Sequence, residues 1–293
     1  MPAALPSSRT GRDRAVDSML ADSAGDAAFA TTLAKGLLVL EAFGAGSSVL
    51  GNTDIAARTG IPRPTVARLT HTLTELGYLS FDRGLAKYRL GVRALRMAHP
   101  LLADMPFRQA ARPLMQDLAA SVRGTVSIGL LDGSAVVYVE TARSGDVGSH
   151  VPDIGMPITV VATAMGRAAA AILPPTEAAR FDAQLAADDA EQWSRFGENY
   201  LAGIAQCADR GFCTCLGEYM PAIHAVAAPL HYAANSGRAF AINCGIPAFR
   251  LQPGQLEAEI GPRIAALAAS IRALINEAEP EISRRPAPAA EAR

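Results

Sequence analysis

Residues 53–77 read TDIAARTGIPRPTVARLTHTLTELG, and this stretch decides the fold of the N-terminal part of the chain. It predicts a short helix, a turn at Gly60, and a second helix that begins at Pro62 or Arg63 and ends at Gly77. This arrangement is typical of a helix-turn-helix, in which the second helix enters the major groove of DNA. The expected buried side chains are Ile55, Ala56, Ile61, Val66, Leu69, Leu73 and Leu76.

The opposite face of the second helix is basic. Arg68 and His71 lie one turn apart on it, and Pro64 and Thr65 lie near its start. Residues 58–96 contain 8 Lys/Arg against 2 Asp/Glu, whereas the whole chain has a net charge of -1. A confined basic patch on a neutral protein favours a polyanion-binding surface, and the alternative interpretation is a solvated face without a partner.

A β-hairpin is predicted directly after this helix. Residues 78–81 and 87–90 alternate in hydrophobicity around Asp82-Arg83-Gly84, which is the pattern of the wing in a winged helix-turn-helix. Arg83 and Lys87 are expected to contact phosphates, while Arg89 fits a solvated surface equally well. The predicted DNA-binding residues are Arg63, Pro64, Thr65, Arg68, His71, Thr72, Arg83 and Lys87.

The flanking segments predict further helices. A helix over residues 32–43 has Leu33, Leu37 and Leu40 as its expected apolar face. Asn52 or Thr53 is the expected N-cap of the next helix. Residues 91–120 are helical in pattern but contain three prolines, which indicates a linker helix followed by the first helix of a second domain.

The second half of the chain mixes strands and helices. Residues 125–131 and 135–140 are β-rich and flank Asp132-Gly133, a strong hairpin signal. Further strands are expected from Cys213 and over residues 225–232 and 238–244. Helices are expected from Ala162 to before Pro174 and over residues 177–187, 198–210 and 255–278. The pattern indicates an α+β sheet domain.

Several segments resemble the IclR family of bacterial transcriptional regulators. TLAKGLLVLEAF, TDIAARTGIPRPTVARLTHTLTELGYL and KYRLG are similar to its DNA-binding domain. The D-G hairpin, the T-A-M-G helix start, the R-G-F strand entry and the A-V-A-A-P-L strand resemble its effector-binding domain. The resemblance implies a GAF-like α/β domain that binds a small, often carboxylate-bearing metabolite, and a linker helix that helps to pair subunits in a homodimer or homotetramer.

The family places its ligand between the sheet and the helix that starts at T-A-x-G. A helix start offers unpaired N–H groups to an anion. From this segment alone a Thr-capped helix without a ligand is the favoured interpretation, and the family resemblance reverses that preference. Where many members have polar residues, often Ser-x-Ser-Gly-Pro, this chain has Asn243-Cys244-Gly245, which favours a roomier site and a bulkier effector. The implied effector-binding residues are Thr163, Ala164, Met165, Gly166, Glu218, Ala225, Asn243 and Gly245.

The predicted organisation has two domains and two tails. We expect a disordered tail over 1–28, a winged helix-turn-helix over 29–92, a linker helix over 93–106, an effector-binding domain over 107–280 and a disordered tail over 281–293. The partners expected are double-stranded DNA, a small-molecule effector and further copies of the chain. We expect a cytoplasmic protein without a membrane segment.

Two other classes of function, an enzyme and an interaction adaptor, fit parts of the sequence. An enzyme could use Cys207, Cys213 or Cys215 with His224 or His231, but the two histidines are seven residues apart and expected on opposite faces of a strand. No common catalytic motif is present, so no catalytic residue, metal or cofactor is predicted. An interaction adaptor leaves the basic helix face and wing unexplained.

Overall fold

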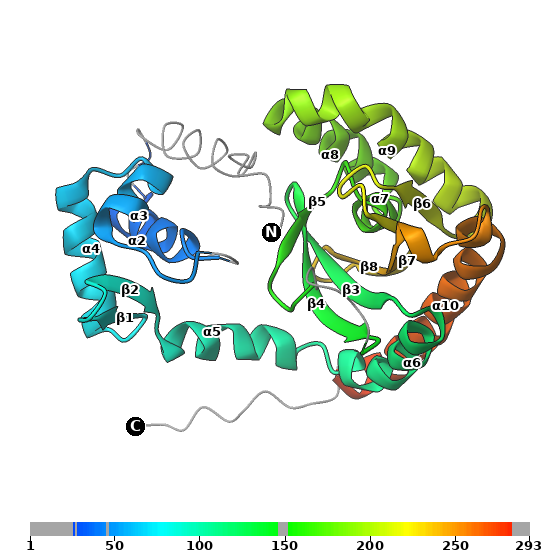
Figure 1. Ribbon diagram of the computed structural model, residues 1–293, viewed down its shortest axis with the longest axis horizontal. Helices are drawn as coiled ribbons and strands as arrows, with labels where there is room; N and C mark the ends of the chain where they lie inside the picture. The colour runs from blue at the N-terminus through cyan, green and yellow to red at the C-terminus, as the bar shows by residue number, and fades with distance from the viewer. Residues whose placement is uncertain (1–25, 27, 45–46, 146–151, 283–293) are drawn as a thin grey trace. The chain divides into compact units, whose positions relative to one another are not determined.

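The computed structural model describes residues 26, 28–44, 47–145 and 152–282 (Figure 1). The chain separates into two compact units, residues 1–105 and residues 106–293, and each is described by itself. The disordered tails predicted over 1–28 and 281–293 lie almost entirely outside the described residues.

The first unit is a winged helix-turn-helix, as predicted. Gly60 ends the first helix of the motif in a left-handed conformation, with a φ of 68°, and its N–H donates to Ala56 O. The wing pairs antiparallel, with Leu79 opposite Leu90. The elements are α2 (Thr31–Glu41), α3 (Asn52–Thr59), α4 (Arg63–Glu75), β1 (Leu79–Asp82), β2 (Lys87–Leu90) and α5 (Val92–Ala103).

The predicted apolar faces of two helices need correction. Leu33 and Leu37 on α2 are 63% and 46% exposed, and the buried residue of that helix is Val39. Leu76, the C-cap residue of α4, is 47% exposed and does not join the buried stripe. The core of this unit comprises Val39, Phe43, Leu50, Ile55, Ile61, Val66 and Leu79.

The N-cap prediction for α3 was also wrong. Gly51 occupies the cap position, and its N–H donates to the Asp54 carboxylate at 2.9 Å. The Asn52 side chain instead accepts a hydrogen bond from the Thr70 hydroxyl at 3.1 Å. This bond and a second one to Ala67 O allow Thr70, a polar residue, to be fully buried between α3 and α4.

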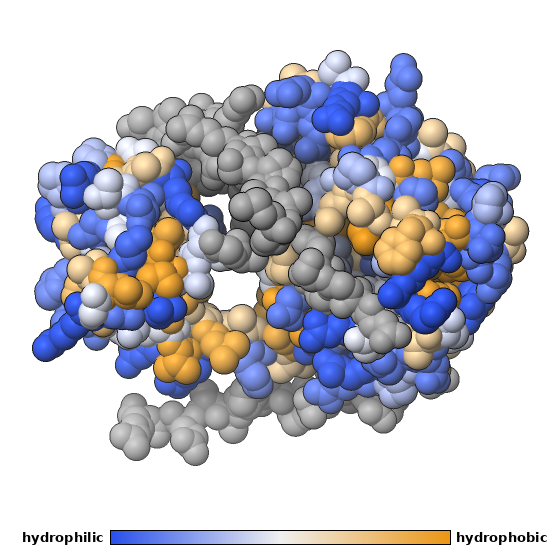
Figure 2. All heavy atoms as spheres, viewed as in Figure 1, coloured by the Kyte–Doolittle hydropathy of each residue, from blue (hydrophilic) through white to orange (hydrophobic). Residues whose placement is uncertain are grey.

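Helix α5 has no buried residue. Val92 and Leu95 are both 71% exposed, and hydrophobic side chains lie on its surface (Figure 2). Pro100 lies inside this helix, so only Pro106, at the start of the next helix, marks a break. An isolated 12-residue helix is marginal in water, so α5 requires packing beyond what the described residues supply.

The second unit is built on a six-stranded antiparallel sheet with the order β5-β4-β3-β8-β7-β6, which confirms the α+β prediction. Its elements are α6 (Phe107–Val122), β3 (Thr125–Asp132), β4 (Ala135–Arg143), β5 (Pro157–Thr159), α7 (Ala164–Ala170), α8 (Pro175–Asp188), α9 (Ala190–Arg210), β6 (Cys213–Leu216), β7 (Ile223–Ala233), β8 (Arg238–Pro247), the 3-10 turn η1 (Ala248–Arg250), the π turn η2 (Leu256–Ile260) and α10 (Gly261–Ile282). Helix α9 begins at Ala190, eight residues before its predicted start, because Asp189 caps it by accepting from Gln192 N.

Helices cover both faces of this sheet (Figure 1). Helix α7 packs on one face, where Ala227 and Ala241 join its core, and α8 and α9 pack outside α7. Helices α6 and α10 cover the other face, where the Phe107 and Phe240 rings meet edge to face at 5.5 Å. Successive residues along β3 and β8 therefore point alternately into the core beneath α7 and into the core beneath α6 and α10.

A bulge in β7 overturns the prediction that His224 and His231 face opposite sides. The register shifts between Pro229 and His231, which moves the alternation by one residue. His224 pairs with Ile246 and His231 with Phe240, and both partners lie on the α10 side of the sheet. The two histidines therefore share a face.

Gly166 sets how closely α7 approaches the chain before it. A Cβ atom at this position would lie 2.2 Å from Val160 O and 2.3 Å from Val160 Cα. Such a contact with backbone cannot be relieved by a side-chain rotation, so only glycine fits.

We predict that Gly166→Ala lowers the free energy of unfolding by about 1–3 kcal/mol, because the added methyl group forces α7 away from Val160. Urea denaturation of the full chain measures the loss. Gly145→Ala is the matched control, since no atom lies within 4 Å of its Cβ position. Equal effects of the two substitutions would contradict the close-packing argument.

Candidate functional site

The outward face of α4 carries the predicted contact residues. Val66 and Thr70 are buried against the core of the first unit, so the other side of the helix points to solvent. A helix held in this way can enter a major groove and present its basic side chains to base edges. Arg63, Pro64, Arg68, His71 and Thr72 are exposed there, and Thr65 is half-buried.

The wing residues differ in their surroundings. Lys87 Nζ lies 3.1 Å from the Asp54 carboxylate, with both side chains a little over two-fifths exposed. The Gly51 N–H and then Lys87 hold the pKa of Asp54 below its usual range. Arg83 is exposed in the turn between β1 and β2. Lys87 thus anchors the wing to α3 while remaining partly exposed, and Arg83 lies at the tip.

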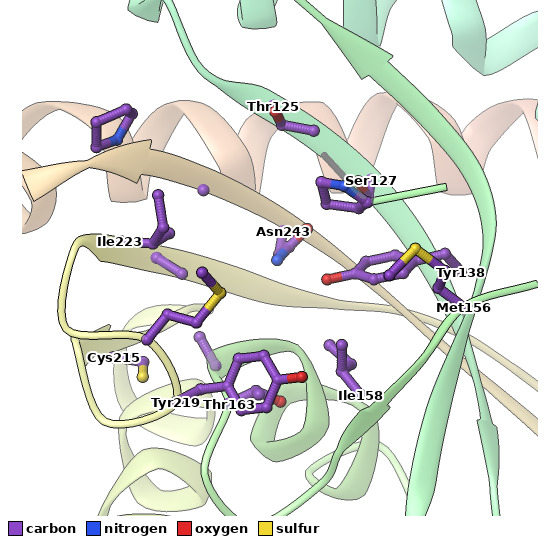
Figure 3. Close-up of a pocket in the computed structure, with 16 residues that line it drawn as sticks. Thr125, Ser127, Tyr138, Met156, Ile158, Thr163, Cys215, Tyr219, Ile223 and Asn243 are labelled. Carbon is purple, nitrogen blue, oxygen red and sulfur yellow. The ribbon is translucent and has the colours of Figure 1, made fainter. Parts of the chain in front are cut away.

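A cavity in the second unit lies between the sheet and the start of α7 (Figure 3). It encloses about 840 Å³ of empty space, counted out to its open mouth, and its walls are mostly apolar. None of the described residues that line it carries a full charge at neutral pH. They are Thr125, Ser127, Tyr138, Pro152, Met156, Ile158, Thr163, Ala164, Cys215, Tyr219, Met220, Ile223, Ala225, Asn243, Gly245 and Pro247.

Five of the eight predicted effector-binding residues line this cavity, namely Thr163, Ala164, Ala225, Asn243 and Gly245. They come from the start of α7, from β7 and from β8. The strand register explains this grouping, because Ala225 pairs directly with Gly245. Paired residues of neighbouring strands point to the same face.

The other three predicted residues do not line the cavity. Met165 is fully buried in the core, with its sulfur against Gly129, where a Cβ would lie 2.3 Å from it. Gly166 packs against Val160 and donates its N–H to the Thr163 hydroxyl at 3.1 Å. Helix α7 therefore begins with the Thr cap that the alternative interpretation described.

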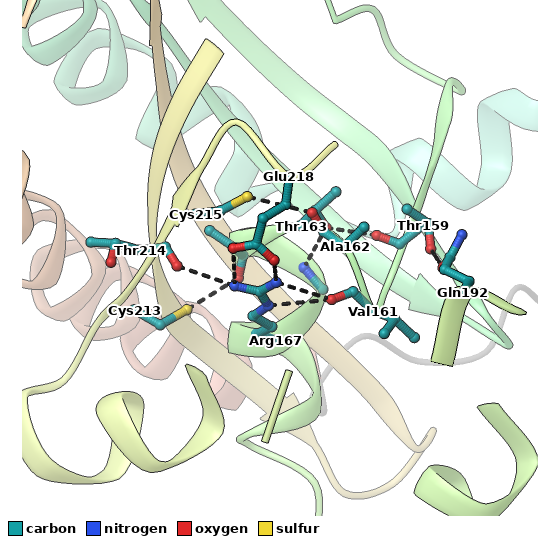
Figure 4. A network of polar contacts seen from close by, with 12 residues as sticks. Thr159, Val161, Ala162, Thr163, Arg167, Gln192, Cys213, Thr214, Cys215 and Glu218 are labelled. Carbon is teal, nitrogen blue, oxygen red and sulfur yellow. Dashed lines mark hydrogen bonds and ion pairs between the residues drawn. The ribbon is translucent and has the colours of Figure 1, made fainter. Parts of the chain in front are cut away.

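Glu218, the third of these residues, forms a buried ion pair with Arg167 (Figure 4). The Arg167 side chain is 2% exposed, and both of its terminal nitrogens contact the carboxylate, Nη1 at 3.1 Å from Oε1. The same guanidinium donates to Val161 O and Thr214 O, each at 3.3 Å. The pair therefore ties α7, the segment before it, β6 and the β6–β7 loop together.

Sequence reasoning missed four polar side chains of the cavity. Thr125 and Ser127 alternate with apolar residues on β3, and this alternation was a usable signal for a polar wall. Tyr138 likewise stands among apolar residues on β4, where the alternation indicates a polar group on one face. Tyr219 lies in the loop between β6 and β7, where no periodicity indicates which way a side chain points.

The cysteine–histidine pair of the enzyme interpretation is not formed between the β6 cysteines and the β7 histidines. Cys213 and Cys215 lie on the α7 side of the sheet and donate to Ala164 O and Ala162 O, respectively. The histidines lie on the α10 side, where the His231 ring is 6.4 Å from the Phe240 ring. Burial raises the pKa of the Cys215 thiol, and the pKa of Cys213 is also raised, first by a hydrogen bond with Cys207.

The described residues were also compared with the requirements of a metal site and of a membrane-spanning helix. No group of three or more His, Cys, Asp or Glu side chains there could hold a metal ion. No helix within the described ranges has the length and apolar character needed to cross a membrane.

A chain that contains a winged helix-turn-helix and a second unit with an uncharged cavity has the composition of a ligand-responsive DNA-binding protein. The family model described as the IclR helix-turn-helix domain matches residues 32–83, and the model described as the bacterial transcriptional regulator IclR C-terminal domain matches residues 99–273. The chain belongs to the IclR family of transcriptional regulators, with a DNA-binding N-terminal domain and an effector-binding C-terminal domain.

Individual relatives are similar over most of the chain. The Pca regulon regulatory protein of Pseudomonas putida is 29% identical over 83% of each chain. The p-hydroxybenzoate hydroxylase transcriptional activator of Acinetobacter baylyi is 28% identical over 83% of this chain and 91% of its own. The crystal structure of an IclR family regulator from Brucella abortus matches with a TM-score of 0.74 and 33% identity, over 85% of this chain and 94% of that one.

We predict that Glu218→Ala lowers the free energy of unfolding by about 3–5 kcal/mol, because it leaves the buried Arg167 without its counter-charge. Urea denaturation measures the change. The control is Glu259→Ala, which breaks an exposed pair with Arg263 and is expected to change stability by less than about 0.5 kcal/mol. A loss at Glu218 no larger than at Glu259 would show that the ion pair is not a structural anchor.

Proposed function

We propose that this regulator binds a near-palindromic DNA site as a dimer and that an aromatic acid in the cavity of the second unit controls this binding. The observation that carries the DNA part is the exposed face of α4, where Arg63, Arg68 and His71 point away from the core. A dimer would place two such helices in major-groove faces about 10 bp apart, or at multiples of this spacing.

The predicted contacts divide into two kinds. Arg68, in the middle of α4, is suited to a bidentate contact with a guanine edge. Arg63, Pro64, Thr65, His71 and Thr72 would support it at base edges and phosphates. Arg83 and Lys87 on the wing would contact phosphates, which contribute affinity and set the register without reading sequence.

The proposed effector follows from the cavity and from one relative. The cavity has apolar walls formed by Met156, Ile158 and Ile223, which suit a ring, and neutral polar groups on the sheet. The A. baylyi relative is named for a p-hydroxybenzoate hydroxylase, which supports an aromatic acid as the effector class here. The ligand would shift the equilibrium between DNA-binding and non-binding states only through different affinities for them.

Dimerisation is supported by α5. This helix has no buried residue, and Val92, Leu95, Met97 and Leu101 are all at least 44% exposed. A second copy of the same helix would bury these side chains through an isologous contact. Higher assemblies, including a homotetramer, are compatible with the same contact.

We predict that Arg68→Ala weakens binding to the specific site by about 1–3 kcal/mol and relaxes sequence preference, because a base contact is lost. Lys87→Ala should weaken binding to all sequences and lower the slope of log K against log salt by about one. Mobility-shift titrations with the chain's own upstream DNA and with random DNA measure both. Arg180→Ala, an exposed arginine on α8, is the control.

The mobility-shift results distinguish a base contact from a phosphate contact for Arg68. Equal losses on specific and random DNA for Arg68→Ala would assign Arg68 to phosphate. Failure of the unaltered chain to prefer its own upstream DNA, with and without ligand, would refute the regulator proposal for that site.

We predict that Leu95→Glu shifts the chain from dimer to monomer, because it places a charge in the apolar contact of α5. Sedimentation velocity measures the mass. Leu114→Glu, at a 38% exposed leucine on α6, is the matched control and should leave the dimer intact. A mass unchanged by Leu95→Glu would exclude α5 as the contact.

A further inference from the structure

Three neutral polar side chains converge inside the cavity from three different elements. Tyr138 comes from β4, Tyr219 from the β6–β7 loop and Asn243 from β8, and their polar ends point toward the same region (Figure 3).

The two phenols are hydrogen-bond donors over the physiological pH range. Tyr138 is 6% exposed, and burial raises the pKa of its hydroxyl well above the usual value. Burial likewise raises the pKa of Tyr219, which lies nearer the mouth and is 40% exposed. A phenol that stays protonated presents an O–H to whatever occupies the cavity.

Asn243 is the third group, and its amide is incompletely satisfied. Its exposed fraction is 9%, yet Oδ1 has no hydrogen-bond partner among the described residues. A buried amide without partners is destabilising, and an apolar side chain of similar size would avoid this penalty. Because Oδ1 is an acceptor, its presence in the wall of a cavity indicates that a bound molecule supplies a hydrogen-bond donor to it.

No cation competes for this role among the described lining residues. Arg167, one turn into α7, is held by Glu218 and points away from the cavity lining. An acidic ligand would therefore be bound by neutral donors alone. A carboxylate suits them, because its two oxygens offer about four lone-pair sites to donors arriving from different directions.

We propose that Tyr138 and Tyr219 bind the carboxylate of the effector, so that its negative charge is held by two phenol O–H groups and not by a basic residue, while Asn243 Oδ1 accepts a hydrogen bond from a hydroxyl group of the same ligand. This inference rests on the proposed aromatic-acid effector and adds the residues that recognise its acid group. It differs from binding at the start of α7, where the Thr163 hydroxyl already occupies the Gly166 N–H.

The β6–β7 loop holds Tyr219 in place through its neighbours. The backbone N–H groups of Glu218 and Tyr219 both donate to the Cys215 sulfur, which itself donates to Ala162 O at 3.4 Å. The Glu218–Arg167 pair fixes the same loop to α7. Tyr219 is therefore positioned before a ligand arrives, which lowers the entropic cost of binding.

The test measures ligand affinity of the full chain by isothermal titration calorimetry. The probes are 4-hydroxybenzoate, benzoate and phenylacetate, each compared with its methyl ester. We expect at least one carboxylate to bind more tightly than its ester. Tyr138→Phe and Tyr219→Phe each remove only an O–H and should weaken that carboxylate roughly tenfold or more, with the ester unchanged.

Two further variants sharpen the test. Tyr232→Phe is the matched control, because Tyr232 bonds to Glu177 outside the cavity, and it should leave affinity unchanged. Asn243→Leu removes the acceptor and should weaken 4-hydroxybenzoate, which carries a hydroxyl donor, more than benzoate, which does not, while the apo chain unfolds at the same or a higher temperature. The affinity of the unaltered chain should stay level between about pH 6 and pH 9, since the titratable lining groups, Tyr138, Tyr219 and Cys215, all have raised pKa values.

Each contrary result overturns the proposal. Esters that bind as well as acids, phenylalanine variants with unchanged affinity, or no binding by any of the three carboxylates would each do so. A fall in affinity across that pH range would assign the charge to a titrating base. Absence of binding by all three carboxylates would refute the aromatic-acid effector itself, whereas unchanged affinity in the phenylalanine variants would refute only the residues assigned to its acid group, so the two failures are distinguishable.

Discussion

The buried ion pair between Arg167 and Glu218 is the constraint on which the arrangement of the cavity depends. Two charges removed from water are stable only when they meet each other and their remaining donors are satisfied. Arg167 meets both conditions through Glu218 and the carbonyls of Val161 and Thr214. The start of α7, the edge strand β6 and the loop that carries Tyr219 are thereby fixed to one another.

The same pair explains why the cavity is neutral. Arg167 lies on α7, the helix whose first residues line the cavity. Its guanidinium is bonded to Glu218 and to backbone carbonyls, so it does not contribute a charge to the cavity wall. It also occupies the outer edge of β6 by donating to Thr214 O, while Gln206 accepts from Thr214 N. The backbone groups of Thr214 at this edge are therefore already bonded within the chain, and recognition of a ligand falls to hydroxyl and amide groups.

The sequence predicted the parts of the fold that depend on regular periodicity and turn chemistry. The two helices around Gly60, the wing and the hairpin at Asp132-Gly133 follow from local spacing alone. The exposed Leu33 and Leu37 were not predictable, because a helix with several leucines has more than one apolar face and packing selects among them. The bulge before His231 was not predictable either. One extra residue in a strand reverses which face the following side chains point to, and nothing in the local sequence marks where that residue is inserted.

A second bulge, in β4, relates the cavity to the first helix of the same unit. Ile128 pairs with Glu140 and Gly129 with Tyr138, so Val139 is the extra residue and its neighbours turn to opposite faces. Tyr138 lines the cavity, whereas Glu140 is 1% exposed and accepts from Arg108 and Arg112 on α6. Arg108 also donates to Val139 O at 2.9 Å. The residue that lines the cavity is thus followed in β4 by two residues that are bonded to α6, the helix that follows the linker in the chain.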